Sequence, residues 1–387
     1  MFAQFFKMPT YSNVSDLWSE FMSDRLFATN KIVRYEYTKR FTKVGHFEMS
    51  IPFDKTFISA LELNGTIYYD NDWLWIQSIQ YDGKTIMLSG TDMKGLLETR
   101  VSLYADQHID GGQGYDIATG TTKACIKHYL DGNAVSPSNI KRILPIYANA
   151  NGAVISGTDG LSEDSYMARL EVLSDIIGNL CENAGIGYDV AGRLSSWCFQ
   201  VSTIEGTNRS HDQTNVTPIV FAVSHRNVRS LTCEHGVSDL YNEVYAVDNN
   251  EIVKMVNRNQ ELDEHGDPKQ VARMLRRECT VTVGTSSIGD DADYFDKYVL
   301  REVADNVASH SFTIEPTVSG YGTEYALGDY VTILDDYTGN LYKRQITEVT
   351  KTYSAGQQTL SLVFGTPKQK PLQKLVNSFI SGTARRR

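Results

Sequence analysis

The segment "LGDYVTILDD" (Leu327 to Asp336) indicates the fold, because an earlier segment, "LNGTIYYDND" (Leu63 to Asp72), has nearly the same pattern. Each begins with Leu, continues with alternating β-forming residues and ends in an acidic cluster. Alternation with a period of two is typical of a strand that buries one face. One strand-and-turn pattern therefore occurs at two distant places in the chain.

The residues that follow each segment extend the similarity. The first is followed by "WLWIQSIQY" and "DGKTIMLSGT", and the second by "NLYKRQITEVTKTY" and "AGQQTLSLVFGT". The positions that match are Ile76 with Ile346, Ile79 with Val349, and Gly90-Thr91 with Gly365-Thr366. Asp82-Gly83 favours a hairpin. Two interpretations stay open: two copies of one small β-barrel, or two ordinary antiparallel sheets that reuse the same residue types.

Strands and helices are also indicated elsewhere. "IVRYEYTKRF" and "HFEMSIPF" flank Gly45 and predict another hairpin. "GTTKACIKHYLDGN" predicts a helix capped by Thr121, and "RLEVLSDIIGNLCENAG" predicts an amphipathic helix that ends at Gly185. Further on, "SWCFQVSTI", "PIVFAVS" and "NEVYAVD" predict strands, and residues 294–311 predict a helix.

The predicted fold class is α+β, mainly β, with two related small β-barrel domains and a helix-containing insertion between them. The expected division is a first barrel (1–105), the insertion (106–190), a mixed α+β connecting domain (191–312), strands that complete the second barrel (313–367) and a C-terminal amphipathic helix or tail (368–387). A chain of 387 residues is long enough for several domains.

Composition restricts the class of function. Hydrophobic residues make up 41% and charged residues 22%, which is ordinary for a globular protein with a buried core. The formal net charge of −10 argues against sequence-specific nucleic-acid binding, which needs clustered Lys and Arg. The five Cys lack zinc-knuckle spacing and are expected to be ordinary thiols of a protein made in a reducing cytosol.

The search for catalytic, cofactor or metal motifs yields no predicted site. Asp335-Asp336 and Asp290-Asp291 are adjacent acids of the kind found in solvated turns. "HIDGGQGYD" lacks the pattern of a phosphate-binding loop. "CEHGVSD" brings Cys233 and His235 close together, but without a second pair of ligands. We therefore predict no catalytic residue, no metal and no cofactor.

The C-terminal segment "LQKLVNSFISGTARRR" has an apolar stripe at helical spacing and a basic end. The stripe, our candidate for partner contact, consists of Leu372, Leu375, Val376, Phe379 and Ile380. The alternative is a helix that packs on its own domain. We expect no space for a catalytic module after the last predicted strand.

Four stretches together resemble the tail-tip hub proteins of siphophages, also called tail-associated lysins or baseplate hubs, which are related to the hubs of contractile-tailed phages. These stretches are "RFTKVGHFEMSIPF", "LSGTDMKGLLETR", "GTTKACIKHYLDGNAVSP" and "ALGDYVTILDD". They are distributed over most of residues 40–365, whereas the first 30 residues and the loops at 101–116 and 138–165 have no counterpart in the family pattern.

The resemblance implies a structural protein of the virion, made in the host cytoplasm. It implies a homotrimer whose six barrels adapt a six-fold tail tube to a three-fold tip and form the distal end of the DNA channel. Its implied partners are a distal tail or tube protein above, tip, needle or fibre proteins below, and the host envelope. Phage DNA would pass without sequence recognition, through a lumen that we expect to be acidic.

Two other classes of function stay open. One is a tail-associated peptidoglycan hydrolase, with acids that the sequence alone does not pair. The other is a receptor- or glycan-binding tail protein that uses a surface of Tyr and Trp, for instance Trp73 and Trp75, as stacking platforms, although Trp pairs on strands are more often part of the core.

Overall fold

The fold is described from a computed structural model. It describes residues 2–7, 25–103, 116–144, 146, 164–168, 170–193, 198–236, 240–248, 251–257, 273–282, 299, 309–317 and 320–366. The chain forms two compact units. Unit 1 consists of Met1–Leu231 and Thr313–Phe364, and unit 2 of Thr232–Phe312 and Gly365–Arg387.

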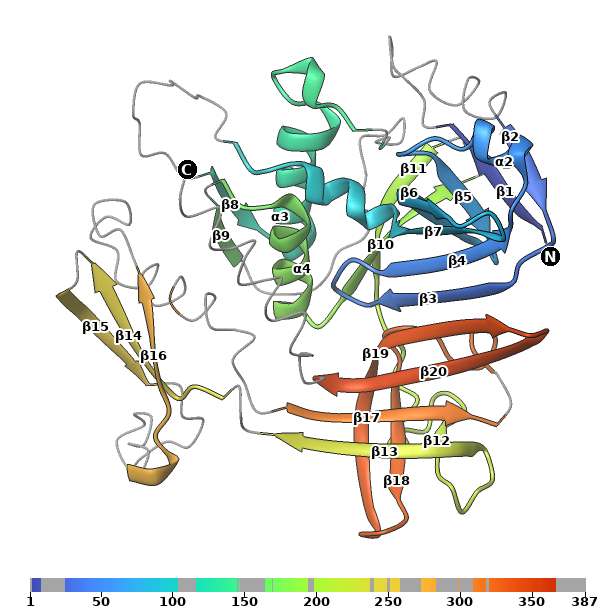
Figure 1. The fold of residues 1–387 in the computed structure, drawn as a ribbon. Helices are drawn as coiled ribbons and strands as arrows, with labels where there is room; N and C mark the ends of the chain where they lie inside the picture. Colours follow the sequence, from blue (N-terminus) through green and yellow to red (C-terminus); the bar gives the residue numbers. More distant parts are fainter. Residues whose placement is uncertain are drawn as a thin grey trace. The chain divides into compact units, whose positions relative to one another are not determined.

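A single thirteen-stranded sheet dominates unit 1 (Figure 1). Its principal strand order is β13-β17-β20-β19-β3-β4-β7-β6-β5-β1-β2, and β18 lies off this path, between β19 and β12. The strands outside the two repeated blocks described next are β1 (Ala3–Phe6), β2 (Arg25–Thr29) and β12 (Val220–Phe221). The predicted mainly-β class is confirmed.

Ten of these strands form two blocks with the same topology. The first block consists of β3 (Arg34–Arg40), β4 (His46–Pro52), β5 (Thr66–Tyr69), β6 (Asp72–Tyr81) and β7 (Thr85–Asp92). The second block consists of β13 (Val228–Gly236), β17 (Ser309–Pro316), β18 (Tyr330–Asp335), β19 (Asn340–Ser354) and β20 (Gln357–Thr366). Both blocks place their strands in the order first, second, fifth, fourth, third.

The two blocks share local geometry as well as strand order. Each has a β-bulge at the same point of its fourth strand, after Ile76 in β6 and after Ile346 in β19. Each has the same two backbone hydrogen bonds where the third strand begins, all 2.9 Å long. The bonds run from Asn64 N–H to Ile76 O, Ile76 N–H to Gly65 O, Gly328 N–H to Ile346 O, and Ile346 N–H to Asp329 O.

The register corrects one detail of the predicted match. Gly90 pairs with Ile76, whereas the partner of Ile346 is Phe364, so the match of Gly90 with Gly365 was wrong by one residue. A Cβ at Gly90 would lie 2.0 Å from the Trp75 carbonyl oxygen. Position 90 therefore requires glycine because the Trp75 carbonyl approaches it closely. The Gly-Thr pair that ends both blocks does not mark equivalent positions in their strand pairing.

The described sheets do not close into two separate barrels, so the predicted barrel architecture is corrected. The first strand of one block, β3, pairs antiparallel with the fourth strand of the other, β19, from Arg34↔Ser354 to Arg40↔Glu348. At 15 residues β19 is long enough to pair with β18 at its start and with β3 and β20 farther along. The pairing joins both blocks in one open sheet.

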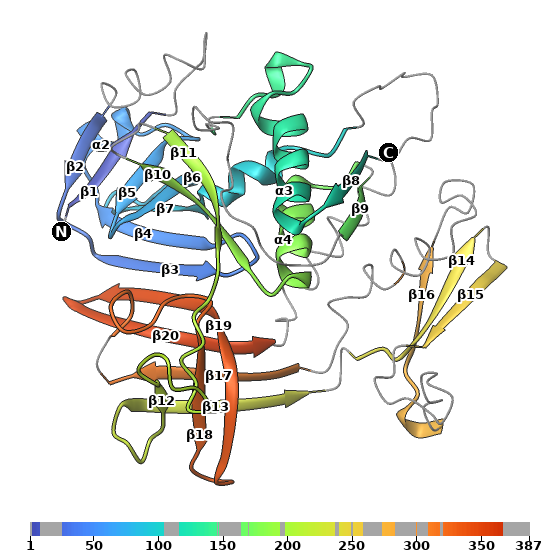
Figure 2. The same ribbon diagram turned by 180° about the vertical axis from the view of Figure 1, so that it is seen from behind.

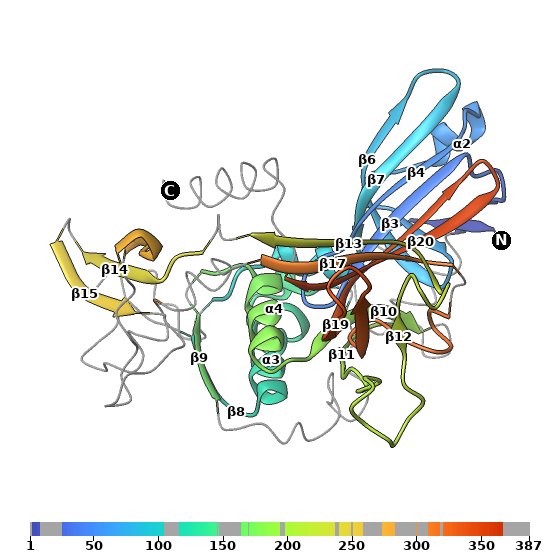
Figure 3. The same ribbon diagram turned by 90° about the horizontal axis from the view of Figure 1, so that it is seen from below.

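The two hairpins predicted around Gly45 and at Asp82-Gly83 are both present. The β3–β4 and β6–β7 pairs are antiparallel, and Gly83 in the second turn has a φ of +82°. Lys84 and Thr85 donate their backbone N–H groups to the Asp82 carboxylate, which closes that turn. In Figure 3 the β6–β7 and β19–β20 hairpins extend from the same side of unit 1.

A helical layer of unit 1 lies between the two blocks in sequence (Figure 2). Its elements are η2 (Met93–Thr99), β8 (Asp116–Gly120), α3 (Thr122–Leu130), η3 (Asp131–Val135), η4 (Ile140–Arg142), β9 (Asp164–Ala168), α4 (Leu173–Asn183), β10 (Gly187–Arg193) and β11 (Cys198–Ile204). The short α2 (Lys55–Ala60) precedes β5. Thr121 caps α3 by accepting from the Ala124 N–H, as predicted.

The amphipathic helix α4 confirms its predicted pattern. Leu173, Ile176, Ile177, Leu180 and Cys181 are all buried in one core with α3, β10 and β11. The chain turns after α4 at Gly185, whose φ is +68°. Burial of this apolar stripe accounts for the helix, because packing of one face provides most helical stability in a protein.

Unit 2 contains a three-stranded sheet in the order β15-β14-β16. Its elements are β14 (Glu243–Asp248), β15 (Glu251–Asn257), η5 (Arg273–Leu275) and β16 (Glu278–Thr282). Val244, Ala246, Val281 and Val299 form its described core. The helix predicted at 294–311 lies mostly outside the described residues, and its last three residues belong to β17, because they pair in the sheet instead.

Candidate functional site

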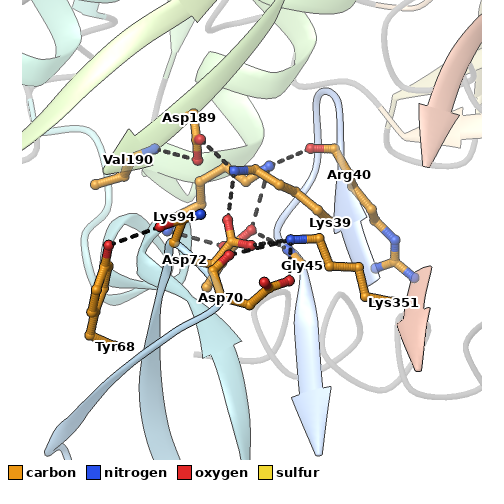
Figure 4. Close-up of polar contacts among 12 residues, drawn as sticks. Lys39, Arg40, Gly45, Tyr68, Asp70, Asp72, Lys94, Asp189, Val190 and Lys351 are labelled. Atoms are coloured by element: carbon orange, nitrogen blue, oxygen red, sulfur yellow. Dashed lines mark hydrogen bonds and ion pairs between the residues drawn. The ribbon is translucent and has the colours of Figure 1, made fainter. Parts of the chain in front are cut away.

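The most distinctive polar feature of unit 1 is a network of buried charges (Figure 4). Its members come from β3, the turn between β5 and β6, β6, β7, η2, β10 and β19, so it joins both sheet blocks to the helical layer. We call it the charge network. It consists of Lys39, Asp70, Asp72, Asp92, Lys94, Asp189 and Lys351.

Lys39 lies near the centre of the charge network. Its Nζ is 2.7 Å from the Asp189 carboxylate and 3.1 Å from that of Asp72. Burial alone would lower the pKa of Lys39, but the two carboxylates outweigh burial and raise it. The ammonium therefore stays charged and holds β3 against both β6 and β10.

Asp72 connects the two blocks. It accepts from Lys39 of β3 and also from Lys351 of β19, at 3.0 Å. Lys351 binds Asp70 as well, at 2.8 Å. Burial would lower the pKa of Lys351, and Asp72 and Asp70 raise it instead. Asp70 and Asn71 form the tight turn before β6, with positive φ values of 52° and 66°, which aims these acids at the lysines.

Lys94 and Asp92 form the deepest part of the network. Lys94 is fully buried, donates to the Arg40 carbonyl oxygen at 2.6 Å and lies 3.7 Å from Asp92. Asp92 accepts from the N–H groups of Gly45 and Lys94, both at 3.1 Å. Burial raises the pKa of Asp92 to about 6 and lowers that of Lys94.

A carboxyl group with a pKa near 6 is suited to proton transfer, but the setting of Asp92 argues for a structural role. Its side chain is 3% exposed, and its two backbone donors hold the carboxylate in place. Buried structural ion networks shift pKa values as well as catalytic sites do. The network can thus fix the position of η2 and β10 against the sheet.

The charge network explains why two of the family-like stretches carry their Gly and Asp. Gly45 of "RFTKVGHFEMSIPF" and Asp92 of "LSGTDMKGLLETR" bind each other directly. Asp92 also caps η2, and Leu96 and Leu97 of the same stretch are buried in the core below. Lys94 stands out in the sequence as a charge beside apolar residues, but the carbonyl oxygen that accepts from it belongs to Arg40 of the distant strand β3.

A second set of contacts between distant segments lies at the start of β18, in the stretch "ALGDYVTILDD". Asp329 accepts from the Thr207 N–H at 2.7 Å and from Arg209 Nε at 3.0 Å. Gly328 has a φ of +95°, and a Cβ there would lie 2.3 Å from the Phe41 ring. A Cβ at Gly187 of β10 would lie 2.4 Å from the same ring. Phe41 is thus enclosed between two glycines, one from each neighbouring segment.

The face of the first block also carries a polar hollow of about 370 Å³ near the β6 bulge. It is lined by Glu36, Thr38, His46, Phe47, Glu48, Gln77, Ser78, Ser89 and Gly90. The hollow has two carboxylates and one imidazole.

The predictions made for individual residues from the sequence have different outcomes in the structure. The predicted partner-contact residues Leu372, Leu375, Val376, Phe379 and Ile380 lie outside the described residues, as do Asp290-Asp291 and most of "HIDGGQGYD". Asp335 accepts from its own turn and Asp336 from the Ser224 N–H, so these adjacent acids act separately. Cys233 and His235 lie on β13.

The predicted alternative role of two tryptophans is wrong. Trp73 is 4% exposed and Trp75 is 9% exposed, and both belong to the core shared with the helical layer. Trp73 packs edge-on against Phe199. Neither ring is available as a stacking platform for a sugar.

Comparison with known proteins identifies the family of this chain. The chain matches the family model described as Siphovirus ReqiPepy6 Gp37-like protein over residues 24–258 and 300–366. No curated protein matches it. None of the described helices is long and apolar enough to cross a membrane.

Three solved structures of tail proteins are similar to this chain at low sequence identity. The tail protein from Neisseria meningitidis MC58 is 14% identical, with a TM-score of 0.51 over 88% of this chain and 93% of that one. The 43 kDa tail protein of prophage MuSo2 from Shewanella oneidensis is 12% identical, with a TM-score of 0.48 over 88% and 95%. Prophage tail protein gp18 from Listeria monocytogenes EGD-e is 9% identical, with a TM-score of 0.49 over 100% and 99%.

The family model spans both sheet blocks and the helical layer between them. It thus confirms the resemblance to siphophage tail proteins, and the chain belongs to the family of Siphovirus ReqiPepy6 Gp37-like proteins.

Proposed function

We propose that this protein is the trimeric hub at the distal end of a phage tail, where it joins a six-fold tube to a three-fold tip. The family is a siphovirus family, and the fold is shared with a bacterial tail protein. The observation that carries the proposal is the repeated strand order of the two blocks, β3-β4-β7-β6-β5 and β13-β17-β20-β19-β18.

Two similar blocks per chain suit a change of symmetry. Three chains contribute six blocks, which can meet a six-fold tube in equivalent ways, while the rest of each chain keeps three-fold symmetry. A closed ring forms when one surface of a subunit binds a different surface of the next, and when the rotation between neighbouring subunits returns the last one to the first. The blocks would act as six related β-modules of the ring, in place of the closed barrels expected from the sequence.

The contact between the blocks within one chain suggests the contact between chains. β3, the first strand of its block, pairs with Glu348–Ser354 of β19 on the edge that faces away from β20. The equivalent edge of the first block is Ser78–Tyr81 of β6, which pairs with β7 and has no second strand partner among the described residues. The equivalent first strand, β13, lies at the end of the described sheet.

We therefore expect β13 of one chain to pair with the β6 edge of the next. Repetition of this contact would alternate with the β3–β19 contact around the ring and would leave neither the β13 edge nor the β6 edge unpaired. Unpaired sheet edges are liable to aggregate, so their closure by assembly is a physical gain. The exposed positions on β13 and at the end of β6, including Tyr81 at 62% exposure, are available for such a contact.

The hub would hold a distal tail or tube protein above and tip, needle or fibre proteins below, with the host envelope beyond. Our candidates for one of these contacts remain Leu372, Leu375, Val376, Phe379 and Ile380. Phage DNA would pass through the ring without being read. The net charge of −10 supports an acidic lumen that repels phosphates.

We assign no enzymatic activity in this proposal. The acids of the charge network are paired and buried, and the tryptophans expected of a glycan site are in the core. A zymogram on bacterial cell walls separates the hub from a peptidoglycan hydrolase. Clearing by the purified chain would contradict the assignment.

The experiment that tests the hub is the mass of the purified chain by light scattering at several concentrations. We expect an assembly of three times the 43.4 kDa chain mass, with six lobes around the ring in electron micrographs. A stable monomer or an assembly with two-fold symmetry would contradict the proposal.

Hydrogen exchange at two concentrations tests the proposed contact directly. The amides of Ser78–Tyr81 and β13 should exchange more slowly in the trimer than in the diluted monomer. Glu348–Ser354 is the matched control, because its edge is already paired within the chain. Equal exchange at Ser78–Tyr81 in both states would place the subunit contact elsewhere.

A further inference from the structure

Three side chains with soft or borderline metal-ligand atoms meet in unit 2. Cys233 and His235 lie on β13, and His310 lies on β17, the next strand of the sheet. Their Sγ and ring nitrogen atoms all lie within 4.8 Å of one another. This arrangement does not depend on the proposed hub function.

Strand geometry explains how distant residues converge. Cys233 and His235 are two positions apart, so both side chains project from the same face of β13. β17 runs in the opposite direction beside β13 (Figure 1), and it presents His310 on that face. The two imidazole rings are 3.9 Å apart between centroids and 31° from coplanar, so they already approach each other closely.

The three side chains are accessible to solvent, and one of them packs against an apolar residue. His235 is exposed and Cys233 and His310 are half-buried, so an ion can enter from solvent. Phe312, two positions after His310, is fully buried, and its ring is 5.1 Å from the His310 ring. An apolar wall of this kind limits the motion of the imidazole and excludes water from one side of the site.

We propose that Cys233, His235 and His310 form a binding site for a divalent transition metal ion, with Zn²⁺ as the best match. One thiolate and two imidazoles are ligands that zinc prefers, whereas Ca²⁺ and Mg²⁺ require oxygen atoms. Ligand atoms around tetrahedral zinc are separated by about 3.3 to 3.8 Å. The side chains must therefore close by roughly 1 Å, which rotamer adjustment provides.

Three protein ligands leave a fourth position of the tetrahedron open to water or to an incoming group. The bound ion would cross-link β13 to β17 and would close the chain between His235 and His310 into a loop. Ion binding that exists only in the folded state stabilises that state. The expected effect is a tighter anchor for the segment that contains β14, β15 and β16.

The first test is direct titration of the untagged full-length protein with Zn²⁺, in competition with a chromophoric chelator. We expect one ion per chain. With Co²⁺ in place of zinc, a thiolate-to-metal charge-transfer band should appear in the near ultraviolet. Stoichiometry well below one ion per chain would overturn the proposal.

Substitutions locate the ligands. Cys233→Ser and His310→Ala should each weaken Zn²⁺ binding by at least about tenfold, the loss that changes to outer-shell residues alone produce. Cys233→Ser should also abolish the Co²⁺ charge-transfer band. The matched controls are Cys279→Ser, a half-buried thiol of β16, and the exposed His225→Ala. Wild-type affinity in Cys233→Ser or His310→Ala would overturn the assignment.

A third measurement keeps the proposal testable if a variant folds poorly. Zn²⁺ should raise the midpoint of thermal unfolding of the wild-type protein, and a chelator should reverse the shift. The same additions should leave the midpoint of Cys233→Ser unchanged while its circular dichroism spectrum matches that of the wild type. An equal shift in both proteins would show that the stabilising ion binds elsewhere.

Discussion

At the scale of single residues, this protein depends on charges that are buried together. Asp72 accepts from a lysine of each block, Lys39 and Lys351, and Lys39 also binds Asp189 of the helical layer. Side-chain exposure in this group is between 11% and 18%, so solvent screens it weakly. Removal of one partner leaves the others buried without compensation.

Asp72→Asn should destabilise the protein by about 3 kcal/mol, because it leaves two buried ammonium groups with less negative charge. The measurement is urea unfolding followed by tryptophan fluorescence, since Trp73 and Trp75 lie in the adjoining core. The control is Glu36→Gln, whose partner Arg34 is more than half exposed, with an expected cost below about 1 kcal/mol. Equal costs for the two variants would show that burial adds nothing to the Asp72 pairs.

The pH dependence of Asp189 follows from its charge partners. Burial would raise the pKa of Asp189, but Lys39 and Lys94 outweigh burial and lower it. A lowered pKa in the folded state means that the carboxylate stabilises the fold above the ordinary aspartate pKa of about 4. That contribution is lost as the pH falls through the lower, folded-state pKa.

The free-energy difference between wild type and Asp189→Asn should therefore be largest at pH 7 and should shrink below about pH 4. Denaturant unfolding of both proteins across this range provides the measurement. A difference that stays constant from neutral to acidic pH would argue that Asp189 acts through shape and not through charge.

At the scale of elements, close backbone approaches decide how β10 and the two blocks fit together. The Phe41 ring follows β3 and is enclosed by Gly187 at the start of β10 and by Gly328 before β18. The β6 bulge brings the Trp75 carbonyl against Gly90 in a similar way. Such positions tolerate no Cβ unless a neighbour moves.

Gly187→Ala should destabilise unit 1 by about 2 to 3 kcal/mol, because its Cβ overlaps the Phe41 ring. The control is Gly132→Ala, where a Cβ meets nothing within 4 Å, and its effect should be within about 0.5 kcal/mol. In a Phe41→Leu background the cost of Gly187→Ala should fall, since the smaller side chain makes room. If Gly187→Ala cost the same free energy in both backgrounds, that double-mutant cycle would show that Gly187 and the Phe41 ring are not energetically coupled.

At the scale of the whole molecule, the two units differ in how much core the described residues provide. Unit 1 has extensive buried clusters in the first block and the helical layer, and its second block buries further apolar residues such as Ile333, Ile346 and Phe364. The described core of unit 2 consists of Val244, Ala246, Val281 and Val299, with Val256 and Cys279 beside it. Local stability within one protein follows such differences in buried apolar contact.

Hydrogen exchange should therefore proceed faster at the amides of β14, β15 and β16 than at those of β4 and β7. Mass spectrometry of peptic peptides provides the comparison within one sample, so no variant is needed. Equal protection of the two sets would show that unit 2 opens only together with unit 1.

Local pattern was enough to predict much of the fold. Alternation located β3, β4, β6 and β7, and the period of an amphipathic helix located α4, because both patterns follow directly from which face is buried. The repeat of Leu63–Asp72 in Leu327–Asp336 was visible as well, and the shared bulge and backbone bonds agree with it. The register of Gly90 was missed, since a close backbone approach leaves no periodic signal.

The sequence by itself thus determined most strands of the first block, the helices α3 and α4, the repeat and the family, since each depends on residues near one another along the chain. Only the tertiary structure decided that β3 pairs with β19 in one open sheet, that Lys39, Asp72, Asp189 and Lys351 share one buried network, and that His310 joins Cys233 and His235. Each of these contacts joins segments far apart in the chain. The physical reason is that strand pairing and charge burial are settled by which surfaces meet in the folded state, and local pattern specifies each surface without its partner.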